Sequence, residues 1–118
     1  MDKHFVATVE DFAPGTHLLV DVGPRKVGVF NIDGDFHALP NVCVHQWGPV
    51  CEGMVSGTVV ARPENNFELE WAKEGRILVC PWHSAEFDIE TGQCLYNKRL
   101  KLRKYDVTVE DGRVYVTA

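Results

Sequence analysis

Apolar and polar residues alternate with a period of two along most of this chain. β-Branched and aromatic residues recur in short runs that Gly, Pro and Asp-Gly turns interrupt. This pattern is typical of β-strands, whose side chains point alternately to the two faces of a sheet. No stretch has the period of a helix, so the sequence predicts an all-β fold, an antiparallel sandwich or small barrel. The predicted strands are residues 5–9, 16–22, 27–32, 36–39, 105–109 and 113–117.

Two Asp-Gly dipeptides divide these strands into hairpins. Asp33-Gly34 separates the third predicted strand from the fourth, and Asp111-Gly112 separates the last two. Asp-Gly suits a two-residue hairpin turn, because both residues tolerate positive φ angles. The chain has 118 residues, the size of one ordinary domain, so we expect residues 1–118 to form a single domain.

The alternation breaks at residues 40–57 and again at residues 80–87. The first of these loops carries Cys43 and His45 with one residue between them, and the second carries Cys80 and His83 with two residues between them. Binding groups often sit on loops that a rigid sheet holds in place. We call these two segments the first and second ligand loops.

Four such donors can close a tetrahedral zinc site or hold a dinuclear iron–sulfur cluster. Zinc sites built from two Cys and two His usually pair Cys with Cys and His with His. Here each loop offers one thiolate and one imidazole. The mixed pairs therefore favour an iron–sulfur cluster over zinc.

The segment between the two ligand loops is long. Phe67, Leu69 and Trp71 alternate there with glutamates, which predicts a half-buried strand. Gly75 is expected to turn the chain into a further strand at residues 76–79. We interpret this segment as a β-hairpin added within the domain, not as a linker between domains.

The residues around the ligand pairs resemble the Rieske proteins, specifically the Rieske-type ferredoxins, over nearly the whole chain. The resemblance implies one [2Fe–2S] cluster per chain, with Cys43 and Cys80 on the buried iron. It places His45 and His83 on the outer iron, with their far edges near solvent. The matching segments are CVHQWGP at 43–49, EG at 52–53, CPWH at 80–83, EFD at 86–88, TG at 91–92 and the closing hairpin at 105–112.

Several positions depart from the high-potential members of that family. Those proteins carry a disulfide between the ligand loops, where this chain has Gly48 and Trp82. They also carry a Ser and a Tyr that donate hydrogen bonds at the cluster, where this chain has Ala85 and Phe87. Such hydrogen bonds stabilise the reduced cluster. The resemblance therefore implies a potential near the low end of the Rieske range, roughly −150 mV.

The spacing between the ligand pairs is a second departure. His45 and Cys80 are separated by 34 residues, about twice the usual spacing in the family. The surplus falls at about residues 62–75 and includes Glu64, Glu68, Glu70 and Glu74. Two interpretations stay open: a tolerated surface insertion, which costs little free energy, or a partner-recognition element near the cluster.

Two further cysteines, Cys51 and Cys94, match no ligand position. The chain has no signal-peptide pattern and no run of about 20 apolar residues that could form a membrane helix. We therefore expect a soluble, cytoplasmic protein in which these cysteines are unpaired, partly buried thiols and not a disulfide.

The charge balance bears on the choice of partner. Twelve basic and 17 acidic side chains give a formal net charge of −5, which disfavours nucleic acid as a partner and suits a basic protein surface.

The sequence shows no recognisable catalytic base, nucleophile or substrate pocket. We expect a monomeric one-electron carrier, not an enzyme, that passes electrons from a reductase to an oxygenase or related enzyme. The alternative is a Rieske-like small subunit of a nitrite-reductase-type or other multi-subunit reductase.

Overall fold

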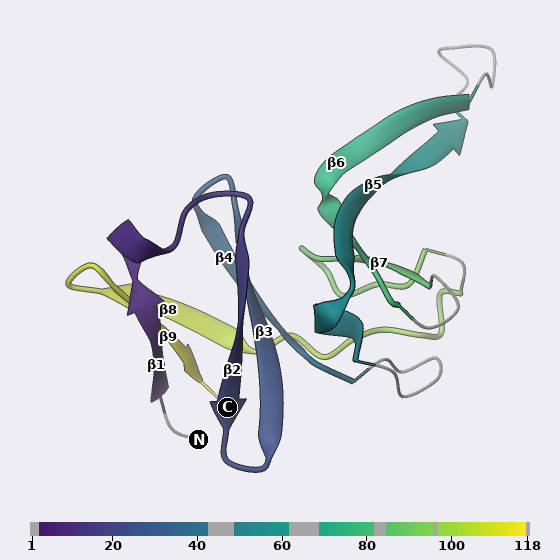
Figure 1. Cartoon of the computed structure of the whole chain (residues 1–118). Helices are drawn as coiled ribbons and strands as arrows, with labels where there is room; N and C mark the ends of the chain where they lie inside the picture. Colours follow the sequence, from purple (N-terminus) through teal and green to yellow (C-terminus); the bar gives the residue numbers. More distant parts are fainter. Residues whose placement is uncertain (1–2, 43–48, 62–68, 82–84, 96, 118) are drawn as a thin grey trace.

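The computed structural model describes residues 3–42, 49–61, 69–81, 85–95 and 97–117 (Figure 1). These residues form three antiparallel sheets of three strands each, with strand orders β1-β9-β8, β2-β3-β4 and β5-β6-β7. Two short 3₁₀ turns, η1 (Val9–Asp11) and η2 (Val50–Glu52), complete the described elements. The strands are β1 Lys3–Thr8, β2 His17–Val22, β3 Arg25–Ile32, β4 Asp35–Pro40, β5 Met54–Ala61, β6 Leu69–Val79, β7 Glu86–Asp88, β8 Asp106–Glu110 and β9 Arg113–Thr117. The predicted all-β fold is confirmed.

Both predicted Asp-Gly hairpins are present. Asp33 and Gly34 have φ angles of 52° and 94° and join β3 to β4, while Asp111 and Gly112 have φ angles of 51° and 73° and join β8 to β9. Two successive positive φ angles are the signature of a type I′ turn, whose twist matches that of the flanking strands.

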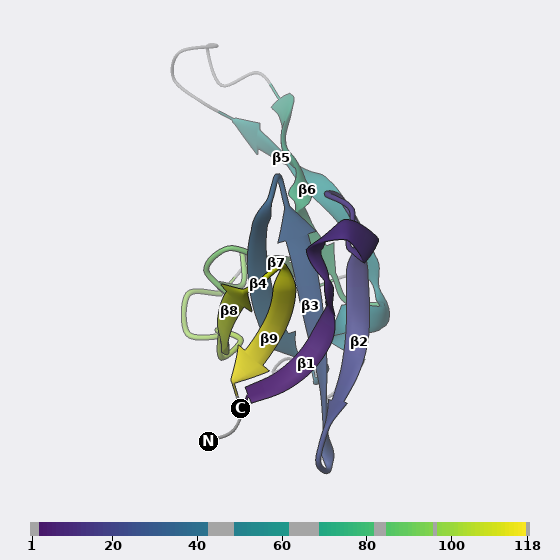
Figure 2. The same cartoon turned by 90° about the vertical axis from the view of Figure 1, so that its left-hand side faces the viewer.

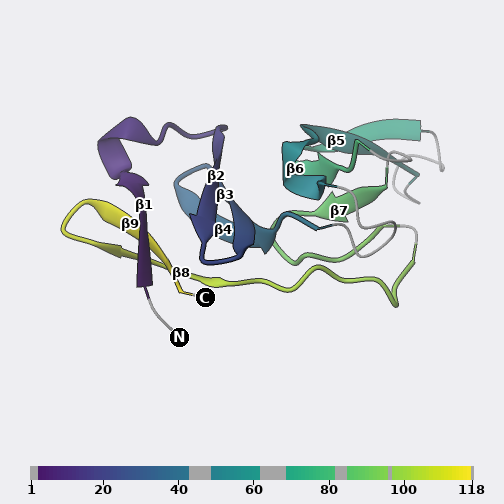
Figure 3. The same ribbon diagram turned by 60° about the horizontal axis from the view of Figure 1, so that its bottom comes forward.

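Strand β3 is buried on both faces over most of its length, and its alternate residues contribute to two hydrophobic cores. Val27 and Val29 pack with Phe12 in one core, whereas Phe30 and Ile32 pack in the other. Figures 1 and 3 show the β5-β6-β7 sheet on one side of the molecule and the other two sheets on the opposite side. The core on the β5-β6-β7 side also contains Cys51, Cys80, Phe87 and Cys94.

The segment between the ligand loops is a hairpin, as predicted, but the predicted turn at Gly75 is wrong. β6 runs through Gly75 as one strand, and Gly75 has a φ angle of +77°. The register explains this angle: between the pairs Ser56↔Ile77 and Thr58↔Ala72, β5 advances by two residues while β6 advances by five. The surplus residues form a bulge, which bends a strand without ending it.

Beyond this bulge the two strands form an arm that projects from the rest of the molecule (Figures 1 and 2). We call the paired residues 58–61 and 69–72 the arm. Trp71 is 58% exposed, so the prediction of a half-buried strand is wrong at this position. Its indole Nε1–H donates to Glu74 Oε2 at 2.5 Å. Phe67 lies outside the described residues.

Within the described part of the chain, no helix is long and apolar enough to cross a membrane.

Candidate metal centre

The structure describes one of the four predicted ligands. Cys80 is described, directly after β6. Cys43, His45 and His83 lie outside the described residues, so their positions as ligands stay a prediction. The structure does describe the bases of both ligand loops, which determine where these loops begin and end.

The second ligand loop is closed at its base by the pairing of β6 with β7. Val79 pairs with Glu86, and the Cys80 amide donates to the Ala85 carbonyl oxygen at 2.8 Å. The side chain of Cys80 is fully buried. Cys80 is therefore held on a rigid strand end, with the loop that contains His83 starting and finishing beside it.

Ala85 and Phe87 are both buried next to this ligand position, and Phe87 pairs with Leu78 on β6. Neither side chain has a hydroxyl group. They can contribute apolar contacts at the site but no hydrogen bond to a cluster sulfur or to a Cys ligand.

The first ligand loop is closed by Asn41, which precedes Cys43 by two residues. Its Oδ1 accepts a hydrogen bond from the Cys51 amide at 2.8 Å, and its Nδ2 donates to Glu52 Oε2 at 2.8 Å. Its own amide donates to the Lys26 carbonyl oxygen at 2.9 Å, which ties it to β3. Asn41 therefore joins the start of the loop to its end.

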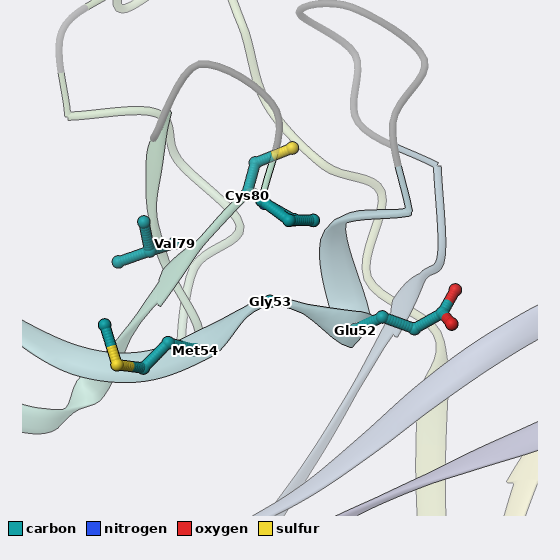
Figure 4. A pocket seen from close by; sticks show the side chains of 6 residues that line it. Glu52, Gly53, Met54, Val79 and Cys80 are labelled. Atoms are coloured by element: carbon teal, nitrogen blue, oxygen red, sulfur yellow. The ribbon is translucent and has the colours of Figure 1, made fainter.

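The bases of the two loops meet at Gly53. A Cβ atom on Gly53 would lie 1.8 Å from the Val79 carbonyl oxygen and 3.0 Å from Pro81 Cδ. Its φ angle of −80° is open to any residue, so the lack of space requires glycine here. Figure 4 shows Gly53 against this strand end, with the Cys80 sulfur turned away from Met54. A surface hollow of about 450 Å³ lies beside them, lined by Glu52, Gly53, Met54, Val79, Cys80 and Pro81.

Cys51 and Cys94 form no disulfide, as predicted, but both are almost fully buried, whereas the sequence predicted partly buried thiols. The Cys51 Sγ–H is within donating distance of the Leu39 and Pro40 carbonyl oxygens, at 3.5 and 3.4 Å. Burial raises the pKa of the Cys51 thiol to about 12, and the Glu52 carboxylate adds to the rise. At neutral pH Cys51 is a protonated thiol, whereas metal ligation needs a thiolate.

This shifted pKa predicts a loss of stability in alkali. The unfolded chain releases the Cys51 proton near its ordinary pKa of 9.0, whereas the folded chain holds that proton to about pH 12. Above pH 9 this thiol lowers the free energy of unfolding by at most about 1.4 kcal/mol per pH unit. Urea unfolding at pH 8, 9.5 and 10.5 is expected to show a steeper loss for the wild type than for Cys51→Ala. Equal slopes would contradict the assignment.

The described residues fit an iron–sulfur cluster. Cys80 places a sulfur donor in an apolar core, where a thiolate would be costly unless a cation neutralised it. Gly53 lets the end of the first ligand loop lie against the start of the second, as a cluster shared by two loops requires. The donor set of two Cys and two His agrees with these observations. Cys43 and Cys80 would hold one iron, and His45 and His83 would hold the other.

Comparison with known proteins identifies the family of this chain. The sequence model of the Rieske [2Fe-2S] domain matches residues 2–106. The chain therefore belongs to the Rieske family, whose domains bind a [2Fe–2S] cluster. It is similar to the ferredoxin subunit of the 3-phenylpropionate/cinnamic acid dioxygenase of Photorhabdus laumondii, with 31% identity over 99% of this chain and 95% of that subunit.

Solved structures support the same fold. A chain in the complex of reduced oxygenase and oxidized ferredoxin of carbazole 1,9a-dioxygenase superposes with a TM-score of 0.74, at 26% identity, over 98% of this chain and 92% of that one. A putative NADH-dependent nitrite reductase small subunit from Mycobacterium tuberculosis has a TM-score of 0.70, at 22% identity, over 98% and 93% of the two chains. The second likeness concerns the fold alone.

Sequence reasoning gave no role to Asn41 and quoted Gly53 only as part of a motif. The role of Asn41 could not be predicted from the sequence, because its hydrogen-bond partners lie ten and eleven residues further along the chain. The glycine carried a clearer signal: it lies within the first ligand loop but not in a predicted turn.

Proposed function

We propose that this protein is a one-electron carrier of the Rieske ferredoxin type, working between a reductase and an oxygenase or related redox enzyme. The observation that carries the proposal is the junction at Gly53, where the end of the first ligand loop lies against the start of the second. The ferredoxin subunit from Photorhabdus laumondii, similar over the whole chain, supports it. A protein of this kind transfers electrons and has no substrate chemistry of its own.

Within this proposal the four ligands divide the work. Cys43 and Cys80 would hold one iron, and the buried setting of Cys80 excludes water from that side. His45 and His83 would hold the other iron, which would exchange its electron with a partner. When bound, the cluster takes up and gives back one electron, at a potential raised by two neutral imidazoles in place of two thiolates.

The EPR spectrum of the dithionite-reduced protein tests the proposal. We expect a Rieske signal with one cluster per chain, and iron and acid-labile sulfide in equal amounts. Iron-loaded protein without that signal, or colourless protein that contains only zinc, would refute it.

Protein-film voltammetry checks the predicted potential. Because Ala85 and Phe87 supply no hydroxyl donors, we expect a value near the low end of the Rieske range, roughly −150 mV. A clearly positive potential near neutral pH would contradict this account of the two positions.

A second candidate function is the small subunit of a nitrite-reductase-type enzyme, which the shared fold of the Mycobacterium tuberculosis protein favours. The two candidates differ in their partner. A stable complex with a large catalytic subunit on gel filtration supports the subunit. A monomer that is reduced by a flavin reductase and reoxidised by an oxygenase supports the carrier.

We also propose a cytoplasmic location for a soluble protein without nucleic-acid or membrane partners. The three described cysteines form no disulfide, which suits a reducing compartment.

The arm supplies a further contact in this proposal. The exposed indole of Trp71 favours partner recognition over a tolerated insertion, because exposed Trp residues often anchor interfaces. Since Ser56 pairs with Ile77, deletion of residues 58–75 leaves Gly57 and Arg76 as a two-residue turn. We expect the shortened protein to keep its EPR signal but to transfer electrons to its partner more slowly. Unchanged transfer would support the tolerated insertion.

A further inference from the structure

Asn41 joins the two ends of the first ligand loop through hydrogen bonds of its side chain. The residue is only 8% exposed, and its side chain uses both its oxygen and its nitrogen within this loop. One bond goes to the Cys51 amide and the other to the Glu52 carboxylate, each at 2.8 Å. Both partners stand after residues 43–48, whereas Asn41 stands before them.

These bonds continue toward the second ligand loop. Glu52 is followed by Gly53, which lies against the carbonyl of Val79, and Val79 is followed by Cys80. The backbone around Glu52 is itself fixed by the η2 turn, in which the Glu52 amide donates to the Pro49 carbonyl oxygen at 3.0 Å. A short series of contacts therefore connects Asn41, two residues before Cys43, to Cys80.

We propose that Asn41 is a positioning residue of the cluster site, which sets the separation of the two ligand loops by joining the ends of the first. The proposal rests on the function proposed above and adds to it a residue outside the ligand motifs. Loss of the Asn41 bonds frees the start of the loop that carries Cys43 and His45. The cluster is then released faster, and the geometry at the irons is less uniform.

The test uses holoprotein and variants of Asn41 and Glu52, whose side chains share a hydrogen bond. Asn41→Ala removes both bonds. Asn41→Asp keeps the acceptor for the Cys51 amide but sets a second carboxylate against Glu52, and like charges at this distance repel. Glu52→Gln keeps an acceptor for Asn41. The double variant Asn41→Asp with Glu52→Gln exchanges donor and acceptor and restores the bond.

Asn31, near the β3–β4 hairpin, provides a matched control. Asn31 is 3% exposed, its Nδ2 donates to the Phe12 carbonyl oxygen at 2.8 Å, and its Oδ1 accepts from the Gly34 amide at 2.8 Å. Asn31→Ala therefore also removes one accepted and one donated bond, although the donated bond goes to a backbone carbonyl and not to a carboxylate. It measures what the loss of a buried Asn with two hydrogen bonds does to stability.

Three readouts are compared: the rate of iron release to a chelator, the EPR linewidth of the reduced protein, and the melting temperature of the apoprotein. We expect about tenfold faster iron release and a broadened signal for Asn41→Ala and Asn41→Asp. Glu52→Gln and the double variant are expected to stay within about twofold of wild type. Asn31→Ala is expected to lower the melting temperature without changing the EPR signal.

The proposal is overturned if Asn41→Ala releases iron as slowly as Asn31→Ala, or if the double variant fails to reverse the effect of Asn41→Asp. If Asn41→Ala does not fold, the comparison of Asn41→Asp with the double variant decides alone. A wild-type protein without a Rieske signal would refute the proposed function itself. A normal wild type with unaffected variants would refute only the role of Asn41.

Discussion

Replacing Gly53 by alanine is expected to prevent stable assembly of the cluster. The added Cβ would lie 1.8 Å from the Val79 carbonyl oxygen, which is backbone and cannot rotate away as a side chain can. Strand β6 would have to move, and this strand carries Cys80 at its end. We expect a loss of about 2 kcal/mol or more in stability, as for other overpacked sites, and an iron content close to zero after purification.

A distant glycine provides the control for this experiment. Gly112 has a φ angle of +73°, and a Cβ there would meet nothing within 4 Å. Gly112→Ala therefore strains the β8–β9 hairpin without touching either ligand loop. It is expected to lower the melting temperature but to keep the visible absorption of the cluster. If Gly53→Ala retains full iron and a wild-type EPR signal, the junction is not needed for assembly.

The second large effect concerns the three described cysteines, which lie in one hydrophobic core. Cys51, Cys80 and Cys94 are each no more than 3% exposed. Only Cys80 belongs to a predicted ligand pair. We expect Cys80→Ala to abolish the Rieske EPR signal, whereas Cys51→Ala and Cys94→Ala keep it at one cluster per chain. Each of the latter two is expected to cost about 1 kcal/mol or more in stability, because it removes a buried side-chain atom.

The three alanine variants serve as controls for one another, since all three remove a buried thiol from the same hydrophobic core. Iron and sulfide content, EPR and the urea midpoint are measured for each. Loss of the signal in Cys51→Ala with an unchanged urea midpoint would identify Cys51 as a ligand and would contradict its assignment as a protonated thiol. A normal signal in Cys80→Ala would remove Cys80 from the ligand set.

Local chemistry made much of the fold predictable. Period-two alternation located strands β1 to β4, β8 and β9 to within one or two residues, and the Asp-Gly turns located both tight hairpins. Gly75 shows the limit of such reasoning. A glycine with a positive φ angle is needed in a turn and in a bulge alike, and only the pairing of β6 with β5 decides between them.

The candidate site divides in the same way. The ligand pairs could be predicted because each pair is local in sequence and its chemistry is distinctive. The residues that hold the loops together could not, since Asn41 and Gly53 act through partners that the fold brings near. Trp71 was predicted to be half-buried from its alternation with glutamates, but in the described part of the chain β7 pairs with β6 only at residues 77–79, outside the arm, and Trp71 is exposed.

The length of the β5–β6 hairpin can change at the arm. Met54 pairs with Val79 at the foot of the hairpin, and residues can be added or removed beyond the bulge without altering that pair. The length of the hairpin is thus uncoupled from the spacing of the ligand loops, although both lie on the same stretch of chain. A reductase or a fluorescent reporter inserted between Ala61 and Leu69 would extend the chain beyond the arm, while the pairing of Met54 with Val79 at the foot of the hairpin stayed in place. The hairpin is therefore a natural position for building a single-chain redox fusion.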